Sequence, residues 1–129
     1  MKLLIDTQSF IWFFEADNKL PLSVRTVMED IDNSLVVSIV SFWEITIKVS
    51  LQKLTLSGNI ETLINNSISS GFEILPVNPA HLITLSGLDF FHKDPFDRMI
   101  IAQAISENIS VISSDSVFKS YPVQWIWRS

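Results

Sequence analysis

Short and nearly continuous apolar runs constrain the fold of this 129-residue chain more than any other feature. Lys2–Ile5, Leu35–Ser38 and Ile109–Ile112 show no alternation between apolar and polar residues. Strands of this kind are buried on both faces, as parallel strands covered by helices are. We therefore expect these runs to be strands of a mainly parallel sheet.

Helical patterns alternate with these strands along the chain. Apolar residues recur at helical spacing in several segments. The predicted helices are Gln8–Ala16, Leu22–Ile31, Ser41–Leu54, Ile60–Ser69, Ala80–Leu85 and Phe96–Glu107. Two further strands are predicted at Phe72–Val77, after a helix-ending Gly71, and at Pro122–Trp127. The alternation predicts a compact α/β sandwich, and the length fits a single domain, 1–129.

Composition excludes several classes of protein. The absence of cysteine excludes disulfide frameworks, thiolate zinc sites, iron–sulfur clusters and cysteine nucleophiles. The 9 Lys and Arg and the 14 Asp and Glu give a net charge of −5, which argues against binding nucleic acid through clustered basic residues. Asp6 ends the first apolar run too early for a signal peptide, and the longest apolar run, Phe10–Phe14, is too short to span a membrane. We therefore expect a cytoplasmic protein that makes no membrane contact.

Four acidic residues are expected at one edge of the sheet. Asp6 follows the first strand directly, and Asp115 follows the strand that ends at Ile112. Glu44 is expected on the first turn of the helix that the second strand enters. Asp97 is expected on the first turn of a helix that runs back into the fourth strand. These positions all lie at the carboxyl ends of the strands, where open parallel sheets bind their ligands.

Four converging carboxylates would repel one another and raise each other's pKa unless a cation compensates. Oxygen ligands without cysteine favour a hard divalent ion, Mg²⁺ or Mn²⁺. Such an ion activates water and stabilises the oxygens of an in-line phosphodiester displacement. The arrangement therefore predicts metal-dependent hydrolysis of a phosphodiester.

Each acid also has a purely structural interpretation. Ser41 and Glu44 match a capping box, in which Ser41 caps the helix and Glu44 bonds back to it. Asp94 suits a helix cap that is followed by a proline, with Asp97 favoured in the first turn by the helix dipole. Asp6 and Asp115 are each suited to cap the segment that follows. The joint placement of the four acids at one edge favours the metal site.

Motifs spread over the whole chain resemble those of one family. They are Leu4–Gln8 with Trp12, Ser41–Ile45 with Lys48, His92–Arg98 followed by Ile101–Ala104, and Ser113–Asp115. In this order and spacing they are similar to the PIN-domain ribonucleases, above all to the VapC-type toxins of bacterial toxin–antitoxin pairs. The block Asp-Pro-Phe-Asp-Arg with its Ala-Gln-Ala continuation is the most specific part.

The resemblance implies a three-layer α/β/α sandwich that cleaves RNA with Mg²⁺ or Mn²⁺. The implied catalytic and metal-binding quartet is Asp6, Glu44, Asp97 and Asp115, which is also the set expected at the sheet edge. A homodimer and an antitoxin partner are implied as well. The chain departs from the family pattern at three positions: Val117 replaces an acid, Gln8 replaces a commoner His, and Ser113 replaces a commoner Thr.

Two basic residues are candidates for contact with a substrate phosphate. Lys48 lies one turn beyond Glu44, so the alternative is an ordinary i,i+4 pair on a helix surface. Arg98 follows Asp97 directly, and the alternative is an ion pair with Asp94.

Three other polar residues lie near the predicted site. Thr7 and Ser113 stand beside strand-end acids, where a hydroxyl can orient a carboxylate or can simply cap a helix. His92 is expected in a loop without a clear partner, and we do not assign it to catalysis.

Aromatic residues are concentrated in two segments. Phe10, Trp12, Phe13 and Phe14 are expected to be mainly core, although a helix apolar on nearly all sides needs cover on a second side. Trp125–Trp127 is expected to form an edge strand packed on the core.

Other functions compete with an endoribonuclease toxin. A PIN-like binding module without catalysis would have the same sequence pattern and differs only in a cleavage assay. A phosphate-accepting receiver would need an acid after the third strand, where Val77 and Asn78 stand. A haloacid-dehalogenase-type phosphatase would need a second acid two residues after Asp6, where Gln8 stands. Both of these alternatives are disfavoured.

Overall fold

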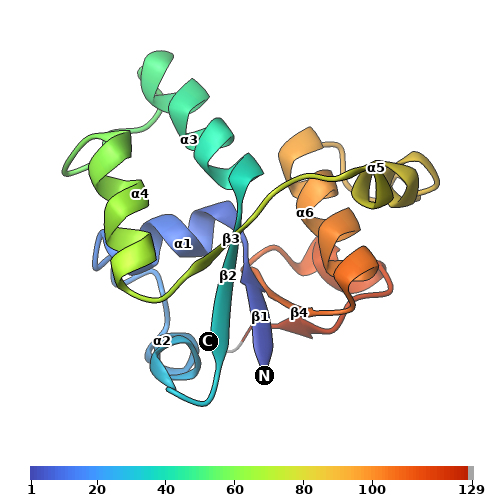
Figure 1. Ribbon diagram of the computed structural model, residues 1–129, viewed down its shortest axis with the longest axis horizontal. Helices are drawn as coiled ribbons and strands as arrows, with labels where there is room; N and C mark the ends of the chain where they lie inside the picture. The colour runs from blue at the N-terminus through green and yellow to red at the C-terminus, as the bar shows by residue number, and fades with distance from the viewer. Residues whose placement is uncertain (128–129) are drawn as a thin grey trace.

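The computed structural model of the protein describes residues 1–127 (Figure 1). The last two residues of the predicted domain, 1–129, lie outside this described part. Its centre is a sheet with the strand order β3-β2-β1-β4-β5, in which every neighbouring pair is parallel. The strands are β1 (Lys2–Ile5), β2 (Ser34–Ser38), β3 (Glu73–Leu75), β4 (Ser110–Ile112) and β5 (Trp125–Ile126). The predicted parallel sheet is confirmed.

Helices connect these strands as predicted. They are α1 (Thr7–Phe14), α2 (Leu22–Glu29), α3 (Ile39–Ser50), α4 (Ile60–Ser69), α5 (Pro79–Ser86) and α6 (Pro95–Glu107), with a short 3-10 helix η1 (Ser116–Ser120) between β4 and β5. None of the helices within residues 1–127 has the length and apolar character needed to cross a membrane.

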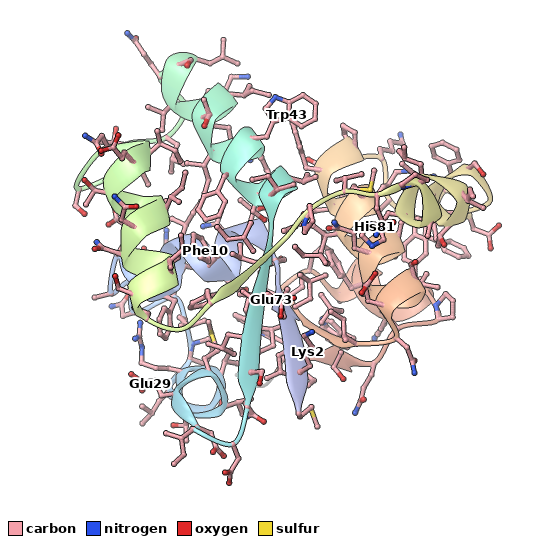
Figure 2. All side chains as sticks on the ribbon, viewed as in Figure 1. Lys2, Phe10, Glu29, Trp43, Glu73 and His81 are labelled. Atoms are coloured by element: carbon pink, nitrogen blue, oxygen red, sulfur yellow. The ribbon has the colours of Figure 1, made fainter. Side chains whose placement is uncertain are left out.

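Both faces of the sheet are covered, which explains the continuous apolar runs. Leu3 and Ile5 of β1 pack in a cluster with residues of α1, α2 and α3, including the fully buried Phe10 (Figure 2). Leu4, between them in sequence, packs in a second cluster with Ile100 and other residues of α6. Figure 1 shows α1, α2 and α4 on one side of the sheet and α5 and α6 on the other. The three-layer α/β/α sandwich is therefore confirmed.

The start of α3 differs from the prediction. Ser38, the last residue of β2, is also the cap of α3, and its Oγ accepts a hydrogen bond from the Val40 amide at 3.1 Å. The chain thus passes from strand to helix without a loop. Ser41 lies inside the helix, so the predicted capping box of Ser41 and Glu44 is wrong, and Glu44 lies on the second turn rather than the first.

Other boundaries differ at the ends of elements. Gln52 has a φ of 59°, and the Lys53 amide bonds to the Lys48 carbonyl, so α3 ends at Ser50 instead of Leu54. Gly71 follows α4 with a φ of 93°, which confirms its predicted role, because glycine adopts this conformation without a steric penalty. The two edge strands, β3 and β5, are shorter than predicted.

Candidate metal centre

The four predicted acids line one cavity of about 320 Å³ at the carboxyl edge of the sheet. They reach it from four elements: the end of β1, the second turn of α3, the first turn of α6 and the segment after β4. The rest of the wall consists of Thr7, Gln8, Ile11, Lys48, Lys53, Leu54, Asp94 and Ser114. Sequence reasoning therefore located both the edge and the acids that meet there.

Asp6 is both a helix cap and a wall of the cavity. Its Oδ1 accepts a hydrogen bond from the Ser9 amide at 2.9 Å at the start of α1, and its side chain is buried. Burial raises the pKa of this carboxyl, and the neighbouring charge of Glu44 adds to the rise, while hydrogen bonds from Ser9 and Ser113 act in the opposite direction. The capping interpretation and the site interpretation of Asp6 are thus compatible.

Glu44 is buried, and its two oxygens differ in their partners. Lys48 Nζ lies 2.6 Å from Glu44 Oε2, and this hydrogen bond raises the pKa of the Lys48 ammonium. Glu44 Oε1 accepts no hydrogen bond from any residue within 1–127. A buried carboxylate oxygen without a partner is costly. Glu44 therefore has one oxygen free to bind a ligand in the cavity.

The carboxyl group of Asp97 is buried at the cavity, and its pKa is strongly raised. Asp94 caps α6 by accepting hydrogen bonds from the Phe96 and Asp97 amides, which holds the first turn at the cavity. Burial first, and then the negative charges of Asp6, Asp94, Glu44 and Asp115, raise the pKa of Asp97 to about 8. The cavity therefore holds more carboxylates than its own residues can neutralise.

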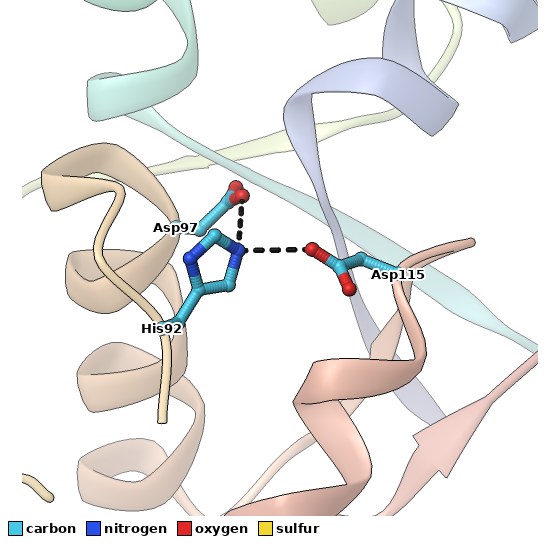
Figure 3. A group of neighbouring side chains, drawn as sticks. All are labelled: His92, Asp97 and Asp115. Atoms are coloured by element: carbon cyan, nitrogen blue, oxygen red, sulfur yellow. Dashed lines mark hydrogen bonds and ion pairs between the residues drawn. The ribbon is translucent and has the colours of Figure 1, made fainter. Parts of the chain in front are cut away.

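Asp115 and Asp97 lie on either side of the ring nitrogen Nε2 of His92 (Figure 3). Asp115 Oδ1 accepts a hydrogen bond from the Val117 amide at 3.0 Å and so caps η1. His92 Nε2 lies 2.9 Å from Asp115 Oδ2 and 3.0 Å from Asp97 Oδ2. The prediction that His92 lacks a partner is wrong.

The sequence contained little signal for this contact. His92 precedes the cap of α6 by two residues, and Asp115 is 23 residues further along the chain. Only the pairing of β4 beside β1 brings the segment after β4 against the loop before α6.

The hydroxyl residues predicted beside the acids have different roles. Ser113 bonds to Asp6 and accepts a hydrogen bond from the Asp115 amide at 3.0 Å, so it contacts two of the predicted acids. Thr7 lines the cavity, but its hydroxyl donates to Ser41 Oγ at 2.9 Å and so joins α1 to α3. Ser113 thus fits the predicted orienting role, whereas the hydroxyl of Thr7 donates to Ser41 and not to an acid of the described part of the chain.

Arg98 does not line the cavity. Its buried guanidinium donates to the carbonyls of Leu88 and Asp89 at 3.2 and 2.8 Å and lies 3.7 Å from the centre of the Phe90 ring. Within residues 1–127 Arg98 forms no ion pair with Asp94, so that alternative is wrong, whereas contact of Arg98 with a substrate phosphate stays a prediction that the loop carbonyls around the guanidinium do not favour. The reason is that successive helix residues point in different directions, so Arg98 faces the 88–92 loop while Asp97 faces the cavity.

The residues around the cavity fit a hard divalent cation. The ligands on offer are carboxylate oxygens, one of them the unpartnered Glu44 Oε1. Burial and then the negative charges of neighbouring acids raise the pKa of Asp97, and a bound cation would offset both effects. Such a donor set suits Mg²⁺ or Mn²⁺.

Comparison with known proteins gives a consistent result. The family model described as "PIN domain" matches residues 3–124. Three solved structures share the fold: VapBC2 from Rickettsia felis bound to a promoter DNA fragment, DNA-bound VapBC from Salmonella typhimurium, and a toxin–antitoxin complex from Klebsiella pneumoniae. No match was found among curated protein sequences.

The structural similarity extends over whole chains although few residues are identical. The Rickettsia chain has a TM-score of 0.76 at 20% identity, with 99% of this chain and 100% of that chain covered. The Salmonella chain has a TM-score of 0.69 at 18% identity, with 98% and 97% covered. The Klebsiella chain has a TM-score of 0.66 at 16% identity, with 97% and 96% covered.

Proposed function

The chain belongs to the PIN-domain family, and from this membership we propose that it is a metal-dependent endoribonuclease acting as the toxin of a toxin–antitoxin pair. Members of this family are usually nucleases. The observation that carries the proposal is the convergence of four carboxylates from four elements on one cavity, with Glu44 Oε1 buried and unpartnered among residues 1–127.

In this proposal Asp6, Glu44, Asp97 and Asp115 hold Mg²⁺ or Mn²⁺. A bound divalent ion would lower the pKa of a water molecule and stabilise the charge that develops on the phosphodiester oxygens. The chain's own part is to fix the carboxylates. Ser9 and Ser113 hold Asp6, and Lys48 holds one oxygen of Glu44.

Two lysines at the cavity are suited to contact the RNA backbone. Lys48 keeps 42% of its side chain exposed while it bonds to Glu44, and Lys53 lines the same wall. Their charges would attract phosphates to an acidic cavity in an acidic protein. Net charge alone is therefore a poor guide to nucleic-acid binding here.

The proposed partners are an antitoxin and a second copy of the chain. The similar solved structures include a toxin–antitoxin complex and two VapBC complexes, which supports the antitoxin. A basic side chain of that antitoxin would be attracted to the carboxylates of the cavity. A second copy would cover an apolar groove between α3, α5 and α6, where 61% of the Trp43 side chain is exposed. We propose that the protein acts in the cytoplasm.

Cleavage of RNA by the purified protein tests the proposed activity. We expect cleavage with Mg²⁺ or Mn²⁺, none with a chelator, and loss of cleavage in Asp6→Asn. Asparagine is also a good helix cap, so this variant should keep α1 and the fold. Asp30→Asn, which changes an exposed acid remote from the cavity, is the matched control and should cleave normally.

The same assay separates the alternatives. Equal cleavage by Asp6→Asn and wild type would overturn the assignment of the site. Binding of Mn²⁺ without cleavage of any RNA offered would favour the binding module that lacks catalysis.

A further inference from the structure

His92 occupies a defined position between two of the proposed metal ligands. Its Nε2 lies 3.0 Å from Asp97 Oδ2 and 2.9 Å from Asp115 Oδ2 (Figure 3). The three ligand atoms of this group lie within 4.8 Å of one another. Two oxygens bound to one small cation at about 2.1 Å are at most about 4.2 Å apart. The imidazole thus holds the two carboxylates near the spacing that joint binding of an ion requires.

The other ring nitrogen determines where the proton of the imidazole lies. Nδ1 accepts a hydrogen bond from the Asp94 amide at 3.1 Å, so its lone pair points at that N–H. The proton of the neutral ring then resides on Nε2, which donates to the two carboxylates. A nitrogen that carries a proton cannot bind a metal, so this geometry makes His92 a donor to the ligands and not a ligand itself.

The ring is held in place from several sides. The His92 amide donates to Tyr121 Oη at 2.8 Å, and that hydroxyl donates to the Asp89 carbonyl at 2.9 Å. Arg98 donates to the His92 carbonyl at 3.3 Å, and the ring packs edge-on against Phe118. Only 15% of the His92 side chain is exposed. These contacts fix the direction in which Nε2–H points.

We propose that His92 is a positioning residue of the metal centre, which holds Asp97 and Asp115 together through Nε2–H so that both can bind the ion. This inference rests on the proposed function, because it presupposes that the two acids are metal ligands. Each carboxylate oxygen has two lone pairs, so an oxygen that accepts from His92 keeps a lone pair for the ion. Partners of this kind typically change metal affinity 10- to 100-fold when they are removed.

The first experiment reads the tautomer by ¹⁵N–¹H NMR of the imidazole rings at neutral pH. The chain has only 2 histidines, so His81→Gln leaves one imidazole and assigns its signals to His92. We expect the Nε2–H form without metal and the same form after addition of Mg²⁺. An Nδ1–H form with metal bound would mean that Nε2 is a ligand and would overturn the proposal.

The second experiment measures Mn²⁺ affinity by calorimetry. His92→Leu keeps the bulk of the side chain and removes the donor, and we expect about 10- to 100-fold weaker binding. His92→Gln keeps an N–H donor of similar reach and should stay within about threefold of wild type. Phe91→Ala removes a partly exposed ring of the same loop that packs against Tyr121, so it perturbs the loop but leaves the donor in place, and it should bind Mn²⁺ nearly as wild type does.

The Mn²⁺ affinities of the three variants distinguish a positioning role of the His92 side chain from a general effect of loop order. Equal losses in His92→Leu, His92→Gln and Phe91→Ala would mean that only the order of the loop matters, and the proposal would fall. Unchanged or tighter binding by His92→Leu would also contradict it.

The fate of this proposal can be separated from that of the proposed function. If the protein binds Mn²⁺ through His92-dependent carboxylates but cleaves no RNA, the positioning role stands and the ribonuclease falls. If the protein cleaves RNA while His92→Leu binds Mn²⁺ as wild type does, the ribonuclease stands and the positioning role of His92 falls. If wild type binds no Mn²⁺ at millimolar concentration, both fall.

Discussion

The two histidines of this chain make similar hydrogen bonds in contrasting surroundings. In each ring Nδ1 accepts from a backbone amide, of Asn78 for His81 and of Asp94 for His92, and Nε2 lies 2.9 Å from a carboxylate. His81 is fully buried between α5 and α6 and faces the single, half-exposed Glu107 (Figure 2). His92 faces two acids at the edge of a cavity that holds several more.

The difference lies in the number of carboxylates, not in the imidazoles. One histidine and one acid form a complete pair that joins two helices, and Glu107 keeps access to solvent. At the cavity one histidine cannot compensate for Asp6, Glu44, Asp97 and Asp115. A histidine–carboxylate contact is therefore no sign of function by itself, whereas an excess of acids around it is.

The largest expected difference between the two regions concerns cleavage. Asp115→Asn should lower the rate of RNA cleavage by at least about 100-fold, because it removes a charged ligand from the proposed metal centre. Asparagine can still cap η1 through its side-chain oxygen, so the fold should persist. The matched change Glu107→Gln should leave the rate unaltered. Cleavage assays with Mn²⁺ measure both, and a comparable loss in Glu107→Gln would remove the distinction.

Metal binding should stabilise the protein through the cavity alone. At a Mn²⁺ concentration of 100 times Kd, the free energy of unfolding should rise by about 2.7 kcal/mol. This gain should largely vanish in Asp97→Asn and persist in Glu107→Gln. Thermal unfolding with and without Mn²⁺ provides the measurement. A gain that survives in Asp97→Asn would place the ion elsewhere.

Replacing His81 should lower the free energy of unfolding more than replacing His92, although His92 is the residue at the proposed metal centre. His81→Leu leaves the Asn78 amide without its partner and removes one of the two acceptors of Gln103 Nε2, so it should lower the free energy of unfolding by about 2 kcal/mol. His92→Leu also removes the acceptor of the Asp94 amide, but the partly exposed site admits water in its place, so the change should be less than about 1 kcal/mol in the absence of metal. Urea unfolding in the presence of a chelator measures the free energy of unfolding of both variants. Equal losses would contradict the expected difference between the two histidines.

The free energy of unfolding of the metal-free protein should depend on pH because buried carboxyl groups at the cavity titrate. The pKa of Asp97 is about 8 in the folded state and near 3.8 in the unfolded chain. Between these values the folded state binds more protons, so stability is greatest at the acidic end and falls as the pH rises towards 8. One group contributes at most about 1.4 kcal/mol per pH unit. The buried Asp6, whose pKa is also raised, adds to the same trend.

Urea unfolding in a chelator between pH 5 and 8 checks this slope. Asp97→Asn should make it shallower, and a saturating concentration of Mn²⁺ should reverse it, because the ion favours the charged carboxylates. An unchanged slope in Asp97→Asn would show that another group titrates.

Much of the fold follows from local sequence signals. Continuous apolar runs such as Lys2–Ile5 encode burial on both faces, and Asn78-Pro79 and Asp94-Pro95 mark the starts of α5 and α6. The position of the acids could be predicted because topology sends every strand end to the same edge. The positions of Asp6 and Asp115 could therefore be predicted without knowledge of side-chain contacts.

The missed features depend on contacts between distant segments or on exact boundaries. His92 meets Asp115 only after β4 has paired with β1. Arg98 turns away from the cavity because three carbonyls of the preceding loop bind its guanidinium. The predicted start of α3 is too late because both Ser38 and Ser41 are good caps, and sequence alone does not choose between them.

The direct passage from β2 into α3 has a mechanical consequence. Ser38 belongs to the sheet and caps the helix at once, so Glu44 is six residues from a strand, with no hinge between them. By contrast, the loop 87–94 precedes Asp97, and Ser113 and Ser114 separate Asp115 from β4. Glu44 is therefore placed by the sheet itself, whereas Asp97 and Asp115 are placed by loop segments whose shape depends on side-chain contacts, such as those of Arg98 and Tyr121. Changes that tune the site over evolution should accumulate in these loop segments, while an insertion between Ser38 and Glu44 would rotate the acid out of the site.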